Sequence, residues 1–218
     1  MSDRPGLFSL VLVPAILTLV VTVVRVVGEI QGWSPQLFGG EGNPRAIVGI
    51  SWLVFVFGAY FGWRLQRTGG GPDKLGRAAI TYIIGVAVVV GGGLGLNAAG
   101  LLVFPSEEAP GPPGGMEYLI GLLAVGVVIA LLAWPRLTLT LILYGYLARI
   151  PVVGAACLDV TEGWATHYGE LPPGLLVEGQ SELIQTLAMP QLTVWPLGIT
   201  PFLGGLCGCL GAALAGKR

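Results

Sequence analysis

The sequence has one histidine, three cysteines and few charged residues, and each shortage excludes a class of function. Because His167 is the only histidine, the chain cannot hold a b-type haem between two of its own histidines, and it lacks the second histidine that zinc hydrolase motifs require. Cys207 and Cys209 are separated by a single residue, and the three cysteines indicate no disulfide framework. We therefore expect no cofactor and no metal site.

Charge is scarce as well, since 11% of the 218 residues are charged and 54% are hydrophobic. The net charge of −1 provides no basic surface, so nucleic acid is not an expected partner. Few water-soluble domains of this length combine so little charge with 36 glycines, and this balance predicts a membrane protein whose first partner is the lipid bilayer. The excess of arginine over lysine, with abundant Gly, Ala and Val, indicates a bacterial source.

Long apolar runs predict an all-α integral membrane protein, a six-transmembrane-helix bundle that forms a single domain over residues 1–218. The run from 118 to 158 would make one helix of about 60 Å, twice the thickness of a hydrocarbon core. Pro135, followed by Arg136, is the expected break in it. The predicted spans cover residues 7–27, 46–63, 78–104, 118–134, 136–158 and 193–215.

Six spans place both chain ends on one side of the membrane, together with eight of the eleven lysines and arginines. The positive-inside rule then predicts a bacterial inner (cytoplasmic) membrane protein with both termini cytoplasmic. The outer loops would be 28–45, 105–117 and 159–192. Within the last loop, residues 175–189 have the apolar spacing of a short amphipathic helix, which we expect to lie along the membrane surface or dock on protein.

His167 lies in this last loop among carboxylates, at Asp159, Glu162 and Glu170. On a helix, His167 and Glu170 would share a face and could ligate a metal or act as a base and its orienting group. The glycines and prolines of the segment disfavour a continuous helix, so the competing interpretation is a water-facing loop anchored by aromatic rings at the membrane interface. We favour the second interpretation.

Arg149 is the charge that the spans bury most deeply, about 20 Å along its helix from Arg136. A charge at that depth is typical of an ion pair, a polar cavity or a substrate path. The alternative is that the side chain snorkels to the outer headgroups, helped by Pro151. The sequence does not decide between the two.

Small residues recur every four positions in two spans, which is typical of closely packed membrane helices. One ridge comprises Gly204, Gly208, Ala212 and Gly216, and the other includes Gly91 and Gly95. Such ridges predict helix packing without showing whether the neighbouring helix belongs to the same chain.

These observations give a leading hypothesis and two alternatives. The leading hypothesis is a non-catalytic accessory or structural subunit of a larger membrane assembly, with other membrane protein subunits as partners. The first alternative is a small permease or channel for an anionic solute that uses Arg149, supported by prolines that could break helices around a cavity. The second is an outer-surface enzyme or metal site at His167.

Overall fold

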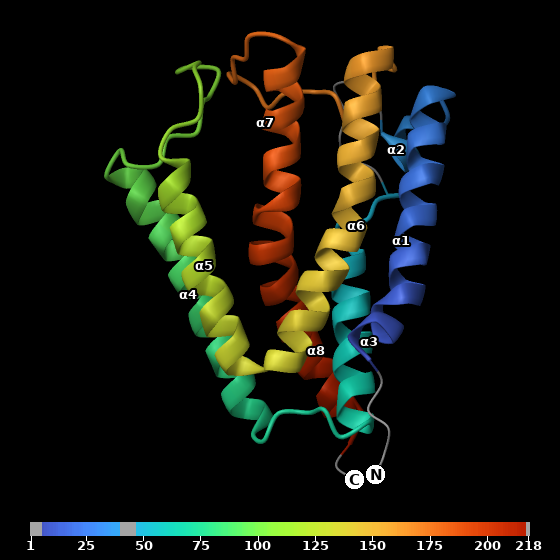
Figure 1. Cartoon of the computed structure of the whole chain (residues 1–218), viewed down its shortest axis with the longest axis vertical. Helices are drawn as coiled ribbons and strands as arrows, with labels where there is room; N and C mark the ends of the chain where they lie inside the picture. The colour runs from blue at the N-terminus through green and yellow to red at the C-terminus, as the bar shows by residue number, and fades with distance from the viewer. Residues whose placement is uncertain (1–5, 40–46, 217–218) are drawn as a thin grey trace.

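The computed structural model describes residues 6–39 and 47–216, which form an all-helical bundle without β-strands in those ranges (Figure 1). Its helical segments are α1 (Leu7–Ile30), α2 (Pro35–Phe38), α3 (Leu53–Arg67), α4 (Leu75–Ala98), α5 (Met116–Ala133), α6 (Pro135–Glu162), α7 (Gln180–Leu192), the π-helical segment η1 (Val194–Ile199) and α8 (Thr200–Leu214). We call the end of the bundle where α1 begins and α8 ends the terminal end, and the opposite end the loop end.

Five helical segments of the described chain are long and apolar enough to cross a membrane: α1, α4, α5, α6 and the continuous rod Gln180–Leu214. The predicted span at 46–63 differs from the structure. Helix α3 begins only at Leu53, residues 47–52 are not helical, and residue 46 lies outside the described ranges. Gly49 and Ser51, both poor helix formers, precede this late start. At 15 residues α3 is about 22 Å long, so the count of six spans stays a prediction.

The predicted break at Pro135 is confirmed. Helix α5 ends at Ala133 and α6 begins at Pro135, where the missing amide proton of proline costs no helical hydrogen bond. The corner is tied to its surroundings, because the indole of Trp134 donates a 2.8 Å hydrogen bond to the carbonyl of Gly70. Thr138 also donates to the carbonyl of Ala130 at 2.7 Å.

The glycine ridge of the last span packs against α3 of the same chain. A Cβ built on Gly58 would lie 2.5 Å from the carbonyl oxygen of Gly204, and one on Gly62 would overlap the backbone of Gly208. Ala212 is buried on the same side of α8. Gly216, predicted to continue this ridge, lies beyond the end of α8, at a φ of +73° with nothing close to its Cβ position.

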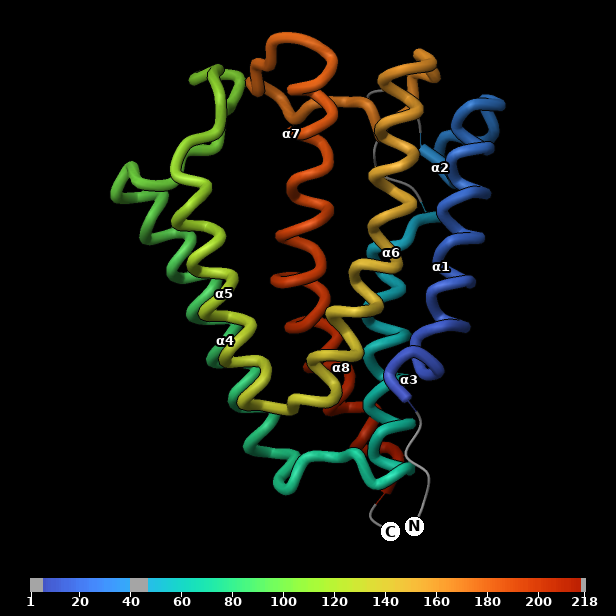
Figure 2. The backbone as a smooth tube through the Cα atoms, in the orientation of Figure 1, coloured from blue at the N-terminus to red at the C-terminus, as the bar shows by residue number. Residues whose placement is uncertain are grey.

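Helix α7 is the first part of the continuous rod Gln180–Leu214. It runs directly into η1 and α8 near the middle of the bundle (Figures 1 and 2), so of the two predicted placements the structure shows docking on protein. The apolar side of α7 faces α6 and the cavity described below, and an amphipathic pattern does not distinguish such a contact from a lipid surface. Because α6 continues to Glu162 and α7 begins at Gln180, the predicted loop 159–192 shortens to residues 163–179.

Charged residues separate between the two ends of the bundle. The terminal end carries Arg64 and Arg67 in the last turn of α3, Arg136 in the first turn of α6, and Lys74 and Arg77 at the start of α4. Carboxylates dominate the loop end, at Glu29, Glu107, Glu108, Glu117, Glu162, Glu170, Glu178 and Glu182. The other charged residues on which the assignment of sides depends, Arg4, Glu41, Arg45, Lys217 and Arg218, lie outside the described residues.

Candidate anion-binding cavity

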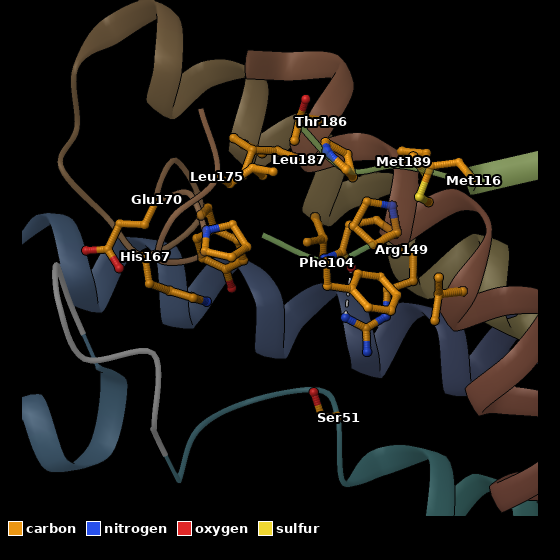
Figure 3. Close-up of a pocket in the computed structure, with 18 of the residues that line it drawn as sticks. Ser51, Phe104, Met116, Arg149, His167, Glu170, Leu175, Thr186, Leu187 and Met189 are labelled. Atoms are coloured by element: carbon orange, nitrogen blue, oxygen red, sulfur yellow. Dashed lines mark hydrogen bonds between the residues drawn. The ribbon is translucent and has the colours of Figure 1, made fainter. Parts of the chain in front are cut away.

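A cavity of about 430 Å³ lies toward the loop end of the bundle, between α5, α6 and α7 (Figure 3). Residues of the loops 99–115 and 163–179 contribute to its wall, and so do Ile50 and Ser51 from the non-helical segment before α3. Irregular backbone at membrane depth is tolerated where it lines a cavity or is buried in protein. The late start of α3 and the presence of the cavity are therefore consistent with each other.

Arg149 of α6 reaches this cavity from within the bundle and is 7% exposed. Its Nη1 donates a 3.0 Å hydrogen bond to the side-chain amide oxygen of Gln191. The guanidinium carbon also lies 3.5 Å from the centroid of the Trp195 ring, a close cation–π stack. These contacts hold the side chain inside the protein, so the alternative of snorkelling to the headgroups does not describe this arrangement.

No carboxylate of the described chain forms an ion pair with Arg149. The salt bridges in those ranges join Glu29 to Arg25 and Glu29 to His167. Gln191 is neutral, and the Trp195 ring offers only the negative face of its quadrupole. Arg149 is thus a buried cation without an anionic partner in the described structure, an arrangement that is costly unless an anion compensates for it.

Irregular turns in the rod Gln180–Leu214 position Gln191 and Trp195, the two partners of Arg149. Pro190 lies inside α7, and the chain passes through the π-helical turn Val194–Ile199 that contains Trp195 and Pro196. Gly145 of α6 lets this turn approach, since a Cβ on Gly145 would lie 3.0 Å from the Cα of Pro196. Short π-helical segments are frequent at functional sites, because they re-aim side chains within a helix.

A cluster of charged and aromatic side chains forms the rim of the cavity nearest the loop end. Glu29, whose side chain is fully buried, accepts a 2.8 Å hydrogen bond from Nε of Arg25 and lies 2.7 Å from Nδ1 of His167. It also accepts a 3.1 Å hydrogen bond from the backbone N–H of His167. Arg25 lies over the ring of Tyr168, with 5.8 Å between the guanidinium carbon and the ring centroid. In contrast to Arg149, Arg25 therefore has a carboxylate partner.

Tyr168 contributes a neutral side chain to this rim. Burial raises the pKa of Tyr168 to about 12, against the opposing influence of the nearby Arg25 guanidinium. The phenol thus remains protonated at physiological pH. Tyr168 therefore offers the cavity a hydroxyl donor without adding charge.

The predicted group around His167 comes together only in part. His167 and Glu170 both line the cavity and lie near one another in Figure 3, but the carboxylate that contacts the imidazole is that of Glu29, from α1. Glu162 is exposed at the end of α6. In the described ranges, no group of three or more His, Cys, Asp and Glu side chains is placed to hold a metal ion.

Asp159, the third carboxylate predicted to surround His167, binds the backbone and a hydroxyl of its own loop. Its carboxylate is buried and accepts hydrogen bonds from the hydroxyl of Thr166 at 2.8 Å and from the backbone N–H of Gly169 at 2.6 Å. A Cβ on Gly169 would lie 2.6 Å from the same carboxylate oxygen. Asp159 therefore fixes the loop that carries His167 and Tyr168 against the end of α6.

The two partners of Arg149, Gln191 and Trp195, were not identified from the sequence. The contact of Glu29 with His167 was also missed. Gln191 is an isolated polar residue beside Pro190 in an apolar run, and this is a signal that could have marked it.

Comparison with known proteins adds no relative, since no protein-family model, no curated protein and no solved structure matches this chain significantly.

Proposed function

We propose that this protein is a multi-pass bacterial inner-membrane protein that binds an anionic solute in the cavity and passes it across the membrane. The observation that carries the proposal is Arg149, which is 7% exposed, faces the cavity and has no carboxylate partner in the described chain. The sequence-based alternative of a small permease thereby gains more support than the accessory-subunit hypothesis.

A buried charge without a counter-ion raises the free energy of the folded protein. An arginine at the centre of a membrane helix costs about 2.5–3.5 kcal/mol on insertion scales. Its hydrogen bond to Gln191 and its stack on Trp195 offset part of that cost but leave the charge uncompensated. An anion that enters the cavity would complete the electrostatic pairing, so the resting protein is arranged to favour its entry.

The orientation belongs to the same proposal. Arginines and lysines crowd the terminal end of the described bundle, and the positive-inside rule assigns that end to the cytoplasm. The cavity and the acidic loop end then lie toward the exterior. Entry of the solute from outside would be limited by Arg25 and His167, which line the cavity and are held by Glu29.

Reconstitution tests the proposal directly. The wild-type protein, Arg149→Leu, Arg149→Lys and the control Arg77→Leu would be placed in liposomes, and the flux of chloride, phosphate, acetate and octanoate measured. At least one anion should move through the wild type and the Arg77 control, with reduced flux in the lysine variant and none in the leucine variant. Equal flux of every anion through the wild type and Arg149→Leu would refute the proposal.

Anion binding without transport can be measured on the same proteins. An anion at 100 times its dissociation constant raises the free energy of unfolding by about 2.7 kcal/mol when it binds only the folded state. Thermal unfolding in nanodiscs should show such a shift for wild type and for Arg77→Leu but not for Arg149→Leu. A shift without flux would identify a binding protein rather than a permease.

A role as accessory subunit remains the second proposal, because one helix has a largely unoccupied surface. Of α4, only Ala78, Tyr82 and Gly85 are buried. Nothing in the described chain lies within 4 Å of a Cβ built on Gly91 or Gly95, so this ridge is available to another helix. Mass measurement in native nanodiscs tests this proposal: a partner or second copy, lost in Gly91→Leu, supports it, and a monomer in native lipid contradicts it.

A further inference from the structure

The cavity that contains Arg149 also has features that define the chemical class of the anion. We infer that it takes an amphiphilic monocarboxylate, a molecule with one carboxylate and an apolar body; this inference rests on the proposed function of anion binding.

The charge balance of the cavity favours one negative charge. Of the two arginines that line it, Arg25 is neutralised by Glu29 and Arg149 is not. A dianion would thus carry one charge more than Arg149 matches, whereas a monoanion is matched by Arg149 alone.

The guanidinium is oriented by its two partners. Its face stacks on the Trp195 ring at 3.5 Å, and Nη1 is used by Gln191 at 3.0 Å. Nε and Nη2, for which the described structure gives no hydrogen bond, form the in-plane edge of the guanidinium away from Gln191. Two parallel N–H donors on such an edge match the two oxygens of a planar carboxylate. This geometry favours a carboxylate over a spherical anion such as chloride.

The remaining wall is largely apolar. Aliphatic, aromatic and thioether side chains line it, from α5, α6, α7, η1 and one loop: Phe104, Met116, Leu119, Val152, Leu187 and Val194. A small hydrated anion would leave these surfaces in contact with water, while an apolar body would cover them and gain the free energy of burial. At about 430 Å³ the cavity lies within the range that holds small organic ligands.

The wild-type protein tests the class without any substitution that could disturb folding. Binding of acetate, butyrate, hexanoate and octanoate would be measured by calorimetry in nanodiscs of zwitterionic lipid, with empty nanodiscs subtracted. Affinity should rise about two- to fourfold for each added methylene. Octanamide, octylammonium and the dianion suberate should each bind at least tenfold more weakly than octanoate.

Two variants connect the binding to the site. Arg149→Leu should lose the preference for octanoate over octanamide, and Leu119→Asn should flatten the chain-length series while leaving acetate affinity within twofold of wild type. A control at an exposed apolar residue outside the cavity, Leu210→Asn, should change neither.

Different outcomes would refute the monocarboxylate class and the anion binding itself. Arg149-dependent binding of acetate, chloride or suberate as tight as that of octanoate would overturn the class and leave the proposed anion binding intact. Binding of octanoate that does not differ between wild type and Arg149→Leu, with no other anion bound, would overturn both.

Discussion

The guanidinium carbon of Arg149 lies 3.5 Å from the centroid of the Trp195 ring, which brings a charge of α6 and a ring of η1 into one stack within the bundle. The stack joins two elements whose backbones already meet closely at Gly145 and Pro196. Because one face of the guanidinium is covered by the indole, the cation stays buried and directs its donors sideways. The same contact offsets part of the cost of burying a charge that no described carboxylate neutralises.

Substitution of Trp195 should therefore weaken anion binding without removing the cation. A cation–π contact contributes about 0.5–2 kcal/mol, so Trp195→Leu should weaken octanoate binding by about twofold to thirtyfold. Trp195→Phe keeps an aromatic face and should lie between the leucine variant and the wild type. Calorimetric titration in nanodiscs measures both, and Trp33→Leu, at an exposed ring of the loop end, is the control. Equal affinity of Trp195→Leu and wild type would show that the stack does not orient the binding group.

The contact of α3 with α8 predicts a large effect of a single methyl group. In Gly62→Ala the new Cβ would overlap the backbone of Gly208, which cannot move aside as a flexible side chain would. The free energy of unfolding should fall by about 1–3 kcal/mol. Gly91→Ala is the matched control on α4, because nothing in the described chain lies within 4 Å of its Cβ position. Reversible unfolding in SDS measures both, and similar stabilities would contradict the observed packing.

Several elements were predictable because local chemistry alone determines them. The corner at Pro135 follows from chain length and from proline's preference for the first turn of a helix. The depth of Arg149 along its helix follows from its distance to the helix start, whereas the choice between burial and snorkelling of its side chain did not. The ridge at Gly204 and Gly208 follows from a four-residue spacing, although its partner α3 could be found only in three dimensions.

The missed features depend on contacts between distant parts of the chain. Glu29 and His167 are 138 positions apart, and Arg149 and Gln191 are 42 apart, so neither pair leaves a periodic signal. The placement of α7 was left open in the sequence because an apolar helix face suits a neighbouring helix or a cavity as well as a membrane surface. The late start of α3 was missed because the residues before Leu53 are apolar enough to continue a span.

The Asp159 carboxylate should control the order of the loop that carries His167. Hydrogen bonds to a charged acceptor contribute about 1.5–3 kcal/mol each, so Asp159→Ala should accelerate amide exchange at Gly169 by tenfold or more. Glu162→Ala, three residues further on at an exposed position, should leave exchange unchanged. Hydrogen exchange with mass spectrometry measures both variants. Unchanged exchange in Asp159→Ala would remove its anchoring role, and metal lost from this variant but not from Glu162→Ala would favour the ligand hypothesis instead.

Labelling of single cysteines decides between five and six crossings, because α3 determines whether position 2 and position 74 face the same side. In a variant with Cys157, Cys207 and Cys209 replaced by serine, the cysteines of Ser2→Cys, Lys74→Cys and Glu107→Cys would be tested with a membrane-impermeant maleimide. If α3 crosses together with the non-helical segment before it, intact cells should label only Glu107→Cys, and permeabilised cells all three.

The two positions on either side of α4 provide an internal control for this experiment. Lys74 and Glu107 are both exposed and flank a helix of 24 residues, about 36 Å long, so they should always label from opposite sides. If the short α3 does not cross, Ser2→Cys should label from the side of Glu107→Cys. The five-span arrangement would then be established, and the N-terminus would lie on the opposite side from Lys74 and Arg77 at the start of α4. The positive-inside rule favours the six-crossing result, since it gathers the basic residues of α3, α4 and α6 on the cytoplasmic side with the N-terminus.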